Sequence, residues 1–394
     1  FERLKRDQTE AMFELSRRAM VAHRASLAFD LLMGALRENP DHDSIRRILG
    51  YQKYRGRWCT RFEVDKLRNG QVWHETFGWL PRAYVKRYEQ GERLHGSRWI
   101  TAEEDARLRR EINSGWDVET EHYTIRTNHS LETGVDMGRQ LERLYRVWKQ
   151  LFVRFYATED QVAALFAGSK RRGPPIRLQN RHAVVYFRDR EDYNRTLSPV
   201  LPNVEISIGV YVDTARRAYF FASEDHEERT LLHEAAHQLF HESRPVAPGV
   251  GSDHNYWIIE GIAMYLESLR DEDGYHVLGG FDDLRMEAAR YRLLSDNFYV
   301  PLSELTTYGI DQVKADKRIG TLYSQAAGLT HFLIHYDHGR YRDALVAYLT
   351  AVYSGRADPG TLARLTGASH PELDRQYREF MEKGPQAESG GESR

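Results

Sequence analysis

Cysteine is almost absent from this sequence, because Cys59 is the only one among 394 residues. A single cysteine excludes an internal disulfide and excludes a metal site built from cysteines alone. Long apolar runs are also absent, since none approaches the roughly 18 residues that a membrane-spanning helix requires. We therefore expect neither a disulfide framework nor a transmembrane segment in this chain.

An excess of charge of one sign is missing too. The 56 basic and 58 acidic residues give a formal net charge of −2, so we expect no nucleic acid and no anionic membrane as the main partner. The basic residues between Lys170 and Arg181 surround Gly173-Pro174-Pro175 and are interpreted as a solvated loop. The first residue is Phe1 rather than Met, which leaves the compartment open but favours an exported, periplasmic or cell-envelope location.

Helical spacing marks the first 50 residues. Leucine and alanine recur every three or four positions from Leu15 to Leu36, the pattern breaks at Asn39-Pro40-Asp41, and it resumes at Ile45. Residues 1–50 are therefore predicted to form a helical pair that resembles a tetratricopeptide-type unit.

Residues 51–113 contain a short repeat. The segment Arg57–Glu63 aligns with Arg98–Glu104, and both have a Trp, then a Thr, and a Glu three residues after the Thr, which is a capping box that opens a helix. Trp79-Leu80-Pro81 stands midway as a degenerate copy with Pro in place of Thr. We predict strand-and-helix units whose Trp residues pack between them. The alternative is that the Trp residues form an aromatic platform for a ligand. If the chain has a protein partner, we expect that partner to bind through the N-terminal repeats.

The remaining sequence places strands before helices. The candidate elements, in order, are a strand at His122–Thr127, a helix at Leu131–Phe155, a strand at Ala183–Phe187 and a hairpin of Ile206–Val212 with Ala218–Ala222. Helical patterns dominate after residue 227. Residues 114–383 are thus predicted to form one α+β domain, in which a small mixed sheet precedes a helical subdomain. The polar residues 384–394 are predicted to form a disordered tail.

The pattern His233-Glu234-Ala235-Ala236-His237 lies in a segment with helical spacing. His233 and His237 then share one face of a helix, so both imidazoles can bind one Zn²⁺. Glu234 lies beside that face, where its carboxylate can reach a water on the metal without binding the metal itself. We interpret the two histidines as metal ligands and Glu234 as a catalytic base.

A catalytic zinc site needs a third protein ligand. His241 continues the same helix face, but eight residues at about 1.5 Å each place it roughly 12 Å from the first histidine. Bonds of about 2 Å to one ion cannot join that span. A metzincin site would require Gly at position 240 and His at 243, where the sequence has Phe240 and Ser243. Asp253 and His254, in the loop that follows, remain alternatives.

Glu260 is the preferred third ligand. It lies in an apolar helical pattern, with Ile259 and Ile262 facing the core, where a carboxylate requires a positive partner such as a metal ion. Gly261, directly after it, lets another backbone approach closely. The alternative is a surface carboxylate at the start of a helix.

Two motifs together resemble the gluzincin branch of zinc metallopeptidases. They are His-Glu-x-x-His at 233–237 and Trp-x-x-Glu-Gly-x-Ala-x-Tyr at 257–265. The stretch from about 118 to 381 is similar to a bacterial family of uncharacterised gluzincin-like domains, which helical repeats often precede. The resemblance implies a gluzincin-like metallopeptidase fold, a Zn²⁺ held by His233, His237 and Glu260, and a peptide or protein substrate.

The resemblance also implies roles for other residues. Glu234 serves as general base, and Tyr323 is similar to the Tyr that stabilises the oxyanion in aminopeptidase-type gluzincins, with a packed core Tyr as the alternative. No Gly-x-Met-Glu-Asn segment stands upstream, so typical aminopeptidase activity is not expected, and Ile206–Tyr211 offers an edge for an extended peptide instead. Glu267 either orients a ligand histidine or faces solvent.

These residues predict a zinc-dependent, metallopeptidase-like hydrolase in which Glu234 assists the attack of zinc-bound water on a peptide carbonyl. A second hypothesis is a binding or scaffold protein that contains zinc without turnover and works through its N-terminal repeats. Zinc-dependent hydrolysis of a substrate other than a peptide is the third.

Overall fold

The computed structural model of the chain describes residues 2–167, 181–223, 228–272 and 275–384. The chain divides into two compact units, Phe1–Glu227 and Glu228–Arg394. This boundary falls inside the range 114–383 that the sequence predicts as one domain. Most of the predicted basic loop, at 168–180, and the predicted tail, at 385–394, lie outside the described residues.

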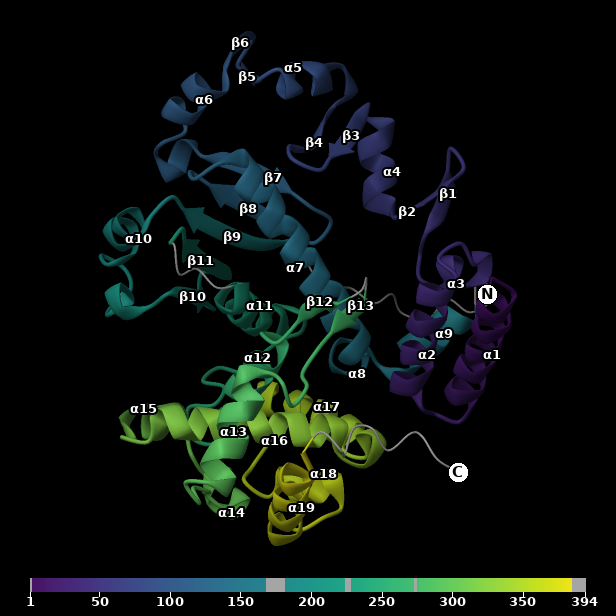
Figure 1. Cartoon of the computed structure of the whole chain (residues 1–394), viewed down its shortest axis with the longest axis vertical. Helices are drawn as coiled ribbons and strands as arrows, with labels where there is room; N and C mark the ends of the chain where they lie inside the picture. The colour runs from purple at the N-terminus through teal and green to yellow at the C-terminus, as the bar shows by residue number, and fades with distance from the viewer. Residues whose placement is uncertain (1, 168–180, 224–227, 273–274, 385–394) are drawn as a thin grey trace. The chain divides into compact units, whose positions relative to one another are not determined.

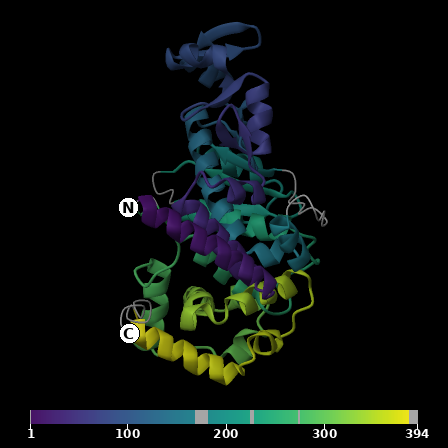
Figure 2. The ribbon, with the colours of Figure 1, turned by 90° about the vertical axis from the view of Figure 1, so that its right-hand side faces the viewer.

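The first unit begins with helices. α1 (Glu2–Val21) and α2 (Ala25–Glu38) lie side by side, as Figure 1 and Figure 2 show, and α3 (Asp43–Ile48) follows. Residues 2–48 thus hold three helices, where the sequence predicts two. The additional break comes at residues 22–24, because His23 has a φ of 57°, a left-handed conformation that an α-helix cannot contain.

Three hairpin–helix units occupy residues 52–108. The hairpins pair β1 (Gln52–Tyr54) with β2 (Arg57–Cys59), β3 (Gln71–His74) with β4 (Gly78–Pro81), and β5 (Glu92–His95) with β6 (Arg98–Thr101). The helices that follow them are α4 (Arg61–Arg68), α5 (Val85–Glu89) and α6 (Ala102–Leu108). Thr60 and Thr101 cap α4 and α6 with their side chains, whereas Pro81 cannot, and a 3₁₀ turn, η1 (Arg82–Tyr84), precedes α5.

A mixed five-stranded sheet follows in the first unit. Its spatial order is β10 (Gly209–Val212), β11 (Arg217–Phe221), β9 (His182–Phe187), β8 (Tyr123–Thr127) and β7 (Trp116–Glu119). β9 is parallel to both of its neighbours, and the two outer pairs are antiparallel. The predicted hairpin is β10–β11, with β10 at the sheet edge. Its first strand is shorter than predicted, because residues Val204–Ile206 form the 3₁₀ turn η4.

Two helices, α7 (Leu131–Leu151) and α10 (Arg190–Leu197), pack against this sheet. The short helices α8 (Val153–Tyr156) and α9 (Glu159–Phe166) pack against α2 instead. α7 packs along β7 and β8 (Figure 1), and Gly138 allows the close approach, since a Cβ there would lie 2.8 Å from Thr120 Cγ2. On α10, Tyr193 and Leu197 are buried against Phe187 and Phe221 of the sheet. The predicted α+β class is confirmed at this level.

The second unit is mainly helical in its described residues. Its helices are α11 (Glu228–Glu242), α12 (Tyr256–Leu266), α13 (Leu284–Leu294), α14 (Leu302–Leu305), α15 (Ile310–Ala315), α16 (Ile319–Gly339), α17 (Arg342–Tyr353), α18 (Thr361–Thr366) and α19 (His370–Lys383). A short hairpin of β12 (Arg270–Glu272) and β13 (Tyr275–Val277), which the sequence does not predict, lies between α12 and α13. Nowhere in the described part of the chain is a helix long and apolar enough to cross a membrane.

α12 forms the centre of the second unit. Every residue from Tyr256 to Leu266 is buried, and α11 and α16 pack against this helix. Gly261 brings α16 especially close, because a Cβ at this position would lie 2.8 Å from the carbonyl oxygen of Ala326. The predicted close approach at Gly261 is therefore confirmed, and it sets the helix that carries Tyr323 against the helix that carries Glu260.

Candidate metal centre

α11 and α12 bring three side chains with metal-ligating atoms together. One ligand atom each from His233, His237 and Glu260 lies within 4.8 Å of the others. The two histidine Nε2 atoms are 3.2 Å apart. The nearest oxygens of Glu260 lie 3.5 Å from His233 Nε2 and 3.7 Å from His237 Nε2.

These separations suit one zinc ion. Donor atoms bonded at about 2.0–2.1 Å to a tetrahedral ion lie roughly 3.3–3.4 Å apart, close to the three distances above. Two imidazoles and one carboxylate also leave a fourth position for water or substrate. The side chains of His233, His237 and Glu260 retain 18%, 14% and 10% exposure, so solvent reaches the group. The donor set, its spacing and its access fit a catalytic zinc.

The other ligand candidates lie apart from this group. His254 Nε2 is 2.6 Å from the carbonyl oxygen of Ala357. The ring of His241 packs edge-on against Tyr353, with 5.2 Å between the ring centroids. Within the described ranges, neither these histidines nor Asp253 belongs to a cluster of three ligating side chains.

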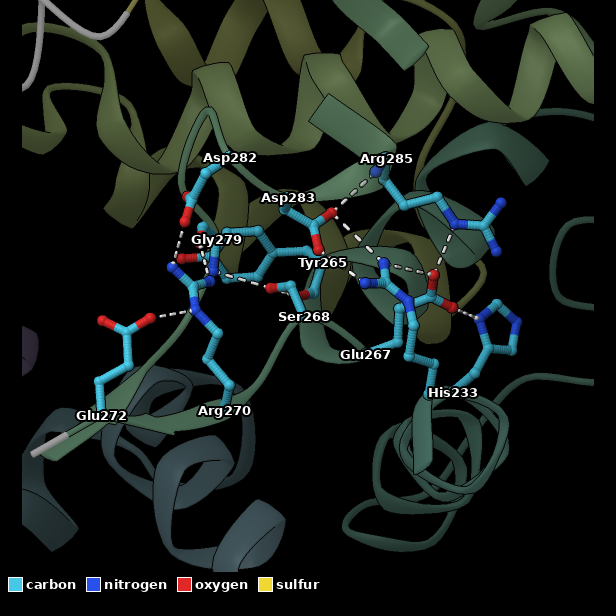
Figure 3. A network of polar contacts seen from close by, with 11 residues as sticks. His233, Tyr265, Glu267, Ser268, Arg270, Glu272, Gly279, Asp282, Asp283 and Arg285 are labelled. Atoms are coloured by element: carbon cyan, nitrogen blue, oxygen red, sulfur yellow. Dashed lines mark hydrogen bonds and ion pairs between the residues drawn. The ribbon is translucent and has the colours of Figure 1, made fainter. Parts of the chain in front are cut away.

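Glu267 holds His233 on the side opposite the ligand atom. Glu267 Oε2 lies 3.0 Å from His233 Nδ1, so a proton on Nδ1 is donated to the carboxylate and Nε2 is left for a metal (Figure 3). Arg229 and Arg285 donate to Oε1 at 3.2 and 2.5 Å. Glu267 is only 3% exposed, which excludes the solvent-facing alternative.

A second carboxylate fixes Arg229. Asp283 Oδ2 accepts from Arg229 Nη1 at 2.8 Å. Asp283 Oδ1 accepts from the backbone N–H of Arg285 at 2.9 Å as the N-cap of α13 (Figure 3). A continuous chain of hydrogen bonds thus runs from the start of α13 through Arg229 and Glu267 to His233. The sequence does not single out Arg229 or Asp283. The one available signal is that Arg229 stands one helical turn before His233.

Tyr256 is another residue of the site that the sequence does not single out. Its hydroxyl donates to Glu260 Oε1 at 2.7 Å from one turn earlier on α12. Tyr323, on α16, lies within hydrogen-bonding reach of Tyr256. Burial, together with the charges of Glu260 and Glu234, raises the pKa of Tyr323 to about 12. The charge of Glu234 also acts on the pKa of His233.

The electrostatics of the three ligand side chains favour a positive charge between them. Burial lowers the pKa of His233, but hydrogen bonds to Glu260 and Glu267 outweigh it and raise that pKa to about 10. Burial lowers the pKa of His237 to about 4, against the opposing charge of Glu260. Burial would raise the pKa of Glu260, yet the histidines lower it to about 2. A bound cation would take the place of the proton on His233.

We expect Glu267→Gln to weaken zinc binding by about 10- to 100-fold, because an amide no longer provides a charged acceptor for the Nδ1 proton of His233. Competition with a chelator of known zinc affinity measures the change. Glu287→Gln, at an exposed position on α13, is the matched control and should keep the wild-type affinity. Thermal unfolding of the metal-free proteins separates lost folding from lost binding, and an unchanged affinity in a folded Glu267→Gln protein would contradict the orienting role.

A protein-family model matches the part of the chain that contains this site. The family is described as "Protein of unknown function (DUF1570)", and the match covers residues 228–356. It begins at the first residue of the second unit and includes His233, Glu234, His237, Glu260 and Tyr323. Among the curated proteins, none matches the chain.

Proposed function

We propose that the protein is a zinc-dependent metallopeptidase of the gluzincin type, a hydrolase of peptide bonds. The observation that carries the proposal is the convergence of His233, His237 and Glu260 within 4.8 Å, with Glu267 bonded to the far nitrogen of His233. Three ligands of this kind leave a position for catalysis, whereas a structural zinc site has four protein ligands. The resemblance of the two sequence motifs to gluzincins supports the same chemistry.

Zinc bound by these side chains supplies a Lewis acid that activates water and polarises a carbonyl. The proton transfers belong to Glu234, which follows His233 on α11 and whose charge acts on both His233 and Tyr323. Its carboxylate accepts a proton from the attacking water as the water oxygen bonds to the carbonyl carbon. The same carboxylate then gives a proton to the leaving nitrogen as the C–N bond breaks.

Tyr323 is the proposed hydrogen-bond donor to the oxyanion. A pKa of about 12 keeps its hydroxyl protonated at neutral pH, as a donor requires. The hydroxyl of Tyr256 donates to Glu260 and lies within hydrogen-bonding reach of Tyr323, whose own O–H stays available for the substrate. Tyr256 therefore positions both Glu260 and Tyr323 before substrate arrives.

Removal and return of zinc test the proposal. We expect the purified protein to contain about one zinc per chain, to cleave members of a mixed peptide library, to lose cleavage after chelation and to recover it with added zinc. Elemental analysis gives the metal content, and mass spectrometry identifies the cleaved bonds. Bound zinc without cleavage of any peptide would favour the zinc-containing binding protein. Cleavage that survives complete chelation would contradict the proposal.

A further inference from the structure

A groove of about 760 Å³ lies in the first unit, between the first two hairpin–helix units and α7. Its lining includes Trp58 on β2, Trp73 on β3 and Trp79 on β4, together with one face of α7. The proposed zinc chemistry does not use this groove. It is large enough for several side chains of a bound segment.

Arginine is the most frequent residue in the lining. Five arginines reach the groove from four elements, namely Arg46 on α3, Arg57 on β2, Arg82 on η1, and Arg139 and Arg146 on α7. Arg139 is paired with Glu75 and Asp136 at 3.2 and 2.7 Å. The other four form no ion pair with an acidic side chain in the described part of the chain, and Arg57, Arg82 and Arg146 are exposed.

The acidic side chains of the lining already have partners inside the unit. Glu63 accepts the backbone N–H of Thr60 at 2.7 Å as part of the capping box of α4, and Glu75 is the partner of Arg139. Neither carboxylate is free to neutralise the four arginines.

Glu121 and Glu142 are the other two carboxylates of the lining, and both interact with neighbouring residues of the unit. Glu142 accepts the backbone N–H of His122 at 2.6 Å and lies 2.7 Å from the Nδ1 of the same residue. Burial raises the pKa of Glu121, against the charge of His122, and the neighbouring Glu142 adds to the increase. Because four arginines of the lining have no acidic partner in the described residues, the charge that the groove offers to a ligand is positive.

Three tryptophans share the lining of the groove with these arginines. Trp58 is half-buried and already carries Lys53 over its ring at 4.8 Å. Trp73 and Trp79 are half-buried, and their rings meet edge-on at 5.8 Å. These rings offer apolar contact, and the guanidinium groups of the same lining offer bidentate pairing with carboxylates.

We propose that this groove binds an extended acidic segment of another protein, with carboxylates on Arg57, Arg82 and Arg146 and apolar side chains on the tryptophans. A planar guanidinium matches a carboxylate with two parallel hydrogen bonds, so dispersed arginines suit side-chain acids spaced along a peptide. A nucleic acid fits less well, because Arg57, Arg82 and Arg146 come from three separate elements and form no continuous track for its line of phosphates. The inference is independent of the zinc site.

Fluorescence anisotropy with a short labelled peptide that alternates Glu and Leu tests this proposal. We expect binding that weakens as salt is added, and no comparable binding of the same peptide with Gln in place of Glu. Arg57→Ala and Arg82→Ala should each weaken binding by about tenfold. Arg98→Ala is the matched control, because Arg98 has the same place in the third hairpin–helix unit as Arg57 has in the first, is exposed and does not line the groove.

Several outcomes would overturn the proposal. They are the absence of binding at low salt, equal binding of the Gln peptide, and an equal loss in Arg98→Ala. A single-stranded DNA oligomer that binds more tightly than the peptide, with the same loss in Arg57→Ala, would assign the groove to nucleic acid instead. Since the substituted arginines are exposed, unchanged circular dichroism should show that each variant is folded.

Discussion

His237→Ala is expected to weaken zinc binding by more than about 100-fold, because loss of a partner that merely orients a ligand costs 10- to 100-fold and loss of a ligand costs more. Only His233 and Glu260 then remain as ligands, with donor atoms 3.5 Å apart. Two protein ligands hold the ion less tightly than three. The neutral form of His237 prevails at pH 7, since burial lowers its pKa to about 4, so its imidazole is ready to bind metal in the wild type. Elemental analysis after dialysis measures the zinc that stays bound, and competition with a chelator measures the affinity for zinc.

His241→Ala is the matched control for this variant. It removes a histidine from the same helix one turn later, where the ring packs on Tyr353 rather than on the ligand group. We expect His241→Ala to retain zinc at the wild-type level. Equal losses in the two variants would point to a damaged helix, and near wild-type affinity in His237→Ala would exclude this group as the metal centre.

The ligands on α11 are predictable from the sequence because a helix fixes which side chains share a face. His233 and His237 are four residues apart, and that spacing places both on one face of the helix, where their Nε2 atoms lie 3.2 Å apart. Glu260 required a tertiary argument. Its position in an apolar helix predicted burial, and Gly261 predicted the close approach that the backbone of Ala326 makes.

The residues around the ligands were not predictable in the same way. Arg229 and Asp283 are 54 positions apart, and their contact depends on the path of the chain between α11 and α13. In the sequence, Arg229 is an ordinary first-turn residue of a helix and Asp283 an ordinary N-cap. Tyr256 has helical spacing to Glu260, yet nothing local distinguishes a hydrogen-bonded tyrosine from a packed one.

Strands and helices were predicted correctly where apolar residues recur with a clear period. The prediction failed where no such period exists. The alternation of apolar residues predicted β10 and β11, and the switch from strands to helices came at the boundary between the two units. The hairpin β12–β13 escaped prediction because Arg270-Asp271-Glu272 has no apolar alternation. Backbone pairing and a polar contact join its strands instead, since His276 Nδ1 on β13 lies 2.5 Å from Asp271 Oδ1 on β12.

Glu234→Gln is expected to lower the rate of peptide cleavage by roughly 100- to 10,000-fold, the contribution of a general base and acid. Glutamine has nearly the same shape but cannot accept a proton at neutral pH, so the attacking water stays unactivated by the protein. Zinc content should not change, because Glu234 lies outside the group of ligating atoms. Mass spectrometry of library digests, with both proteins loaded with equal zinc, gives the rates.

This variant separates catalysis from metal binding, which removal of a ligand cannot do. Glu287→Gln, exposed on α13, should keep wild-type cleavage and shows that the effect is specific to position 234. Equal cleavage by wild type and Glu234→Gln would remove Glu234 from the proton transfers. A zinc site without turnover has no use for a base beside its ligands, so a loss of cleavage at full zinc occupancy would distinguish the hydrolase from the scaffold.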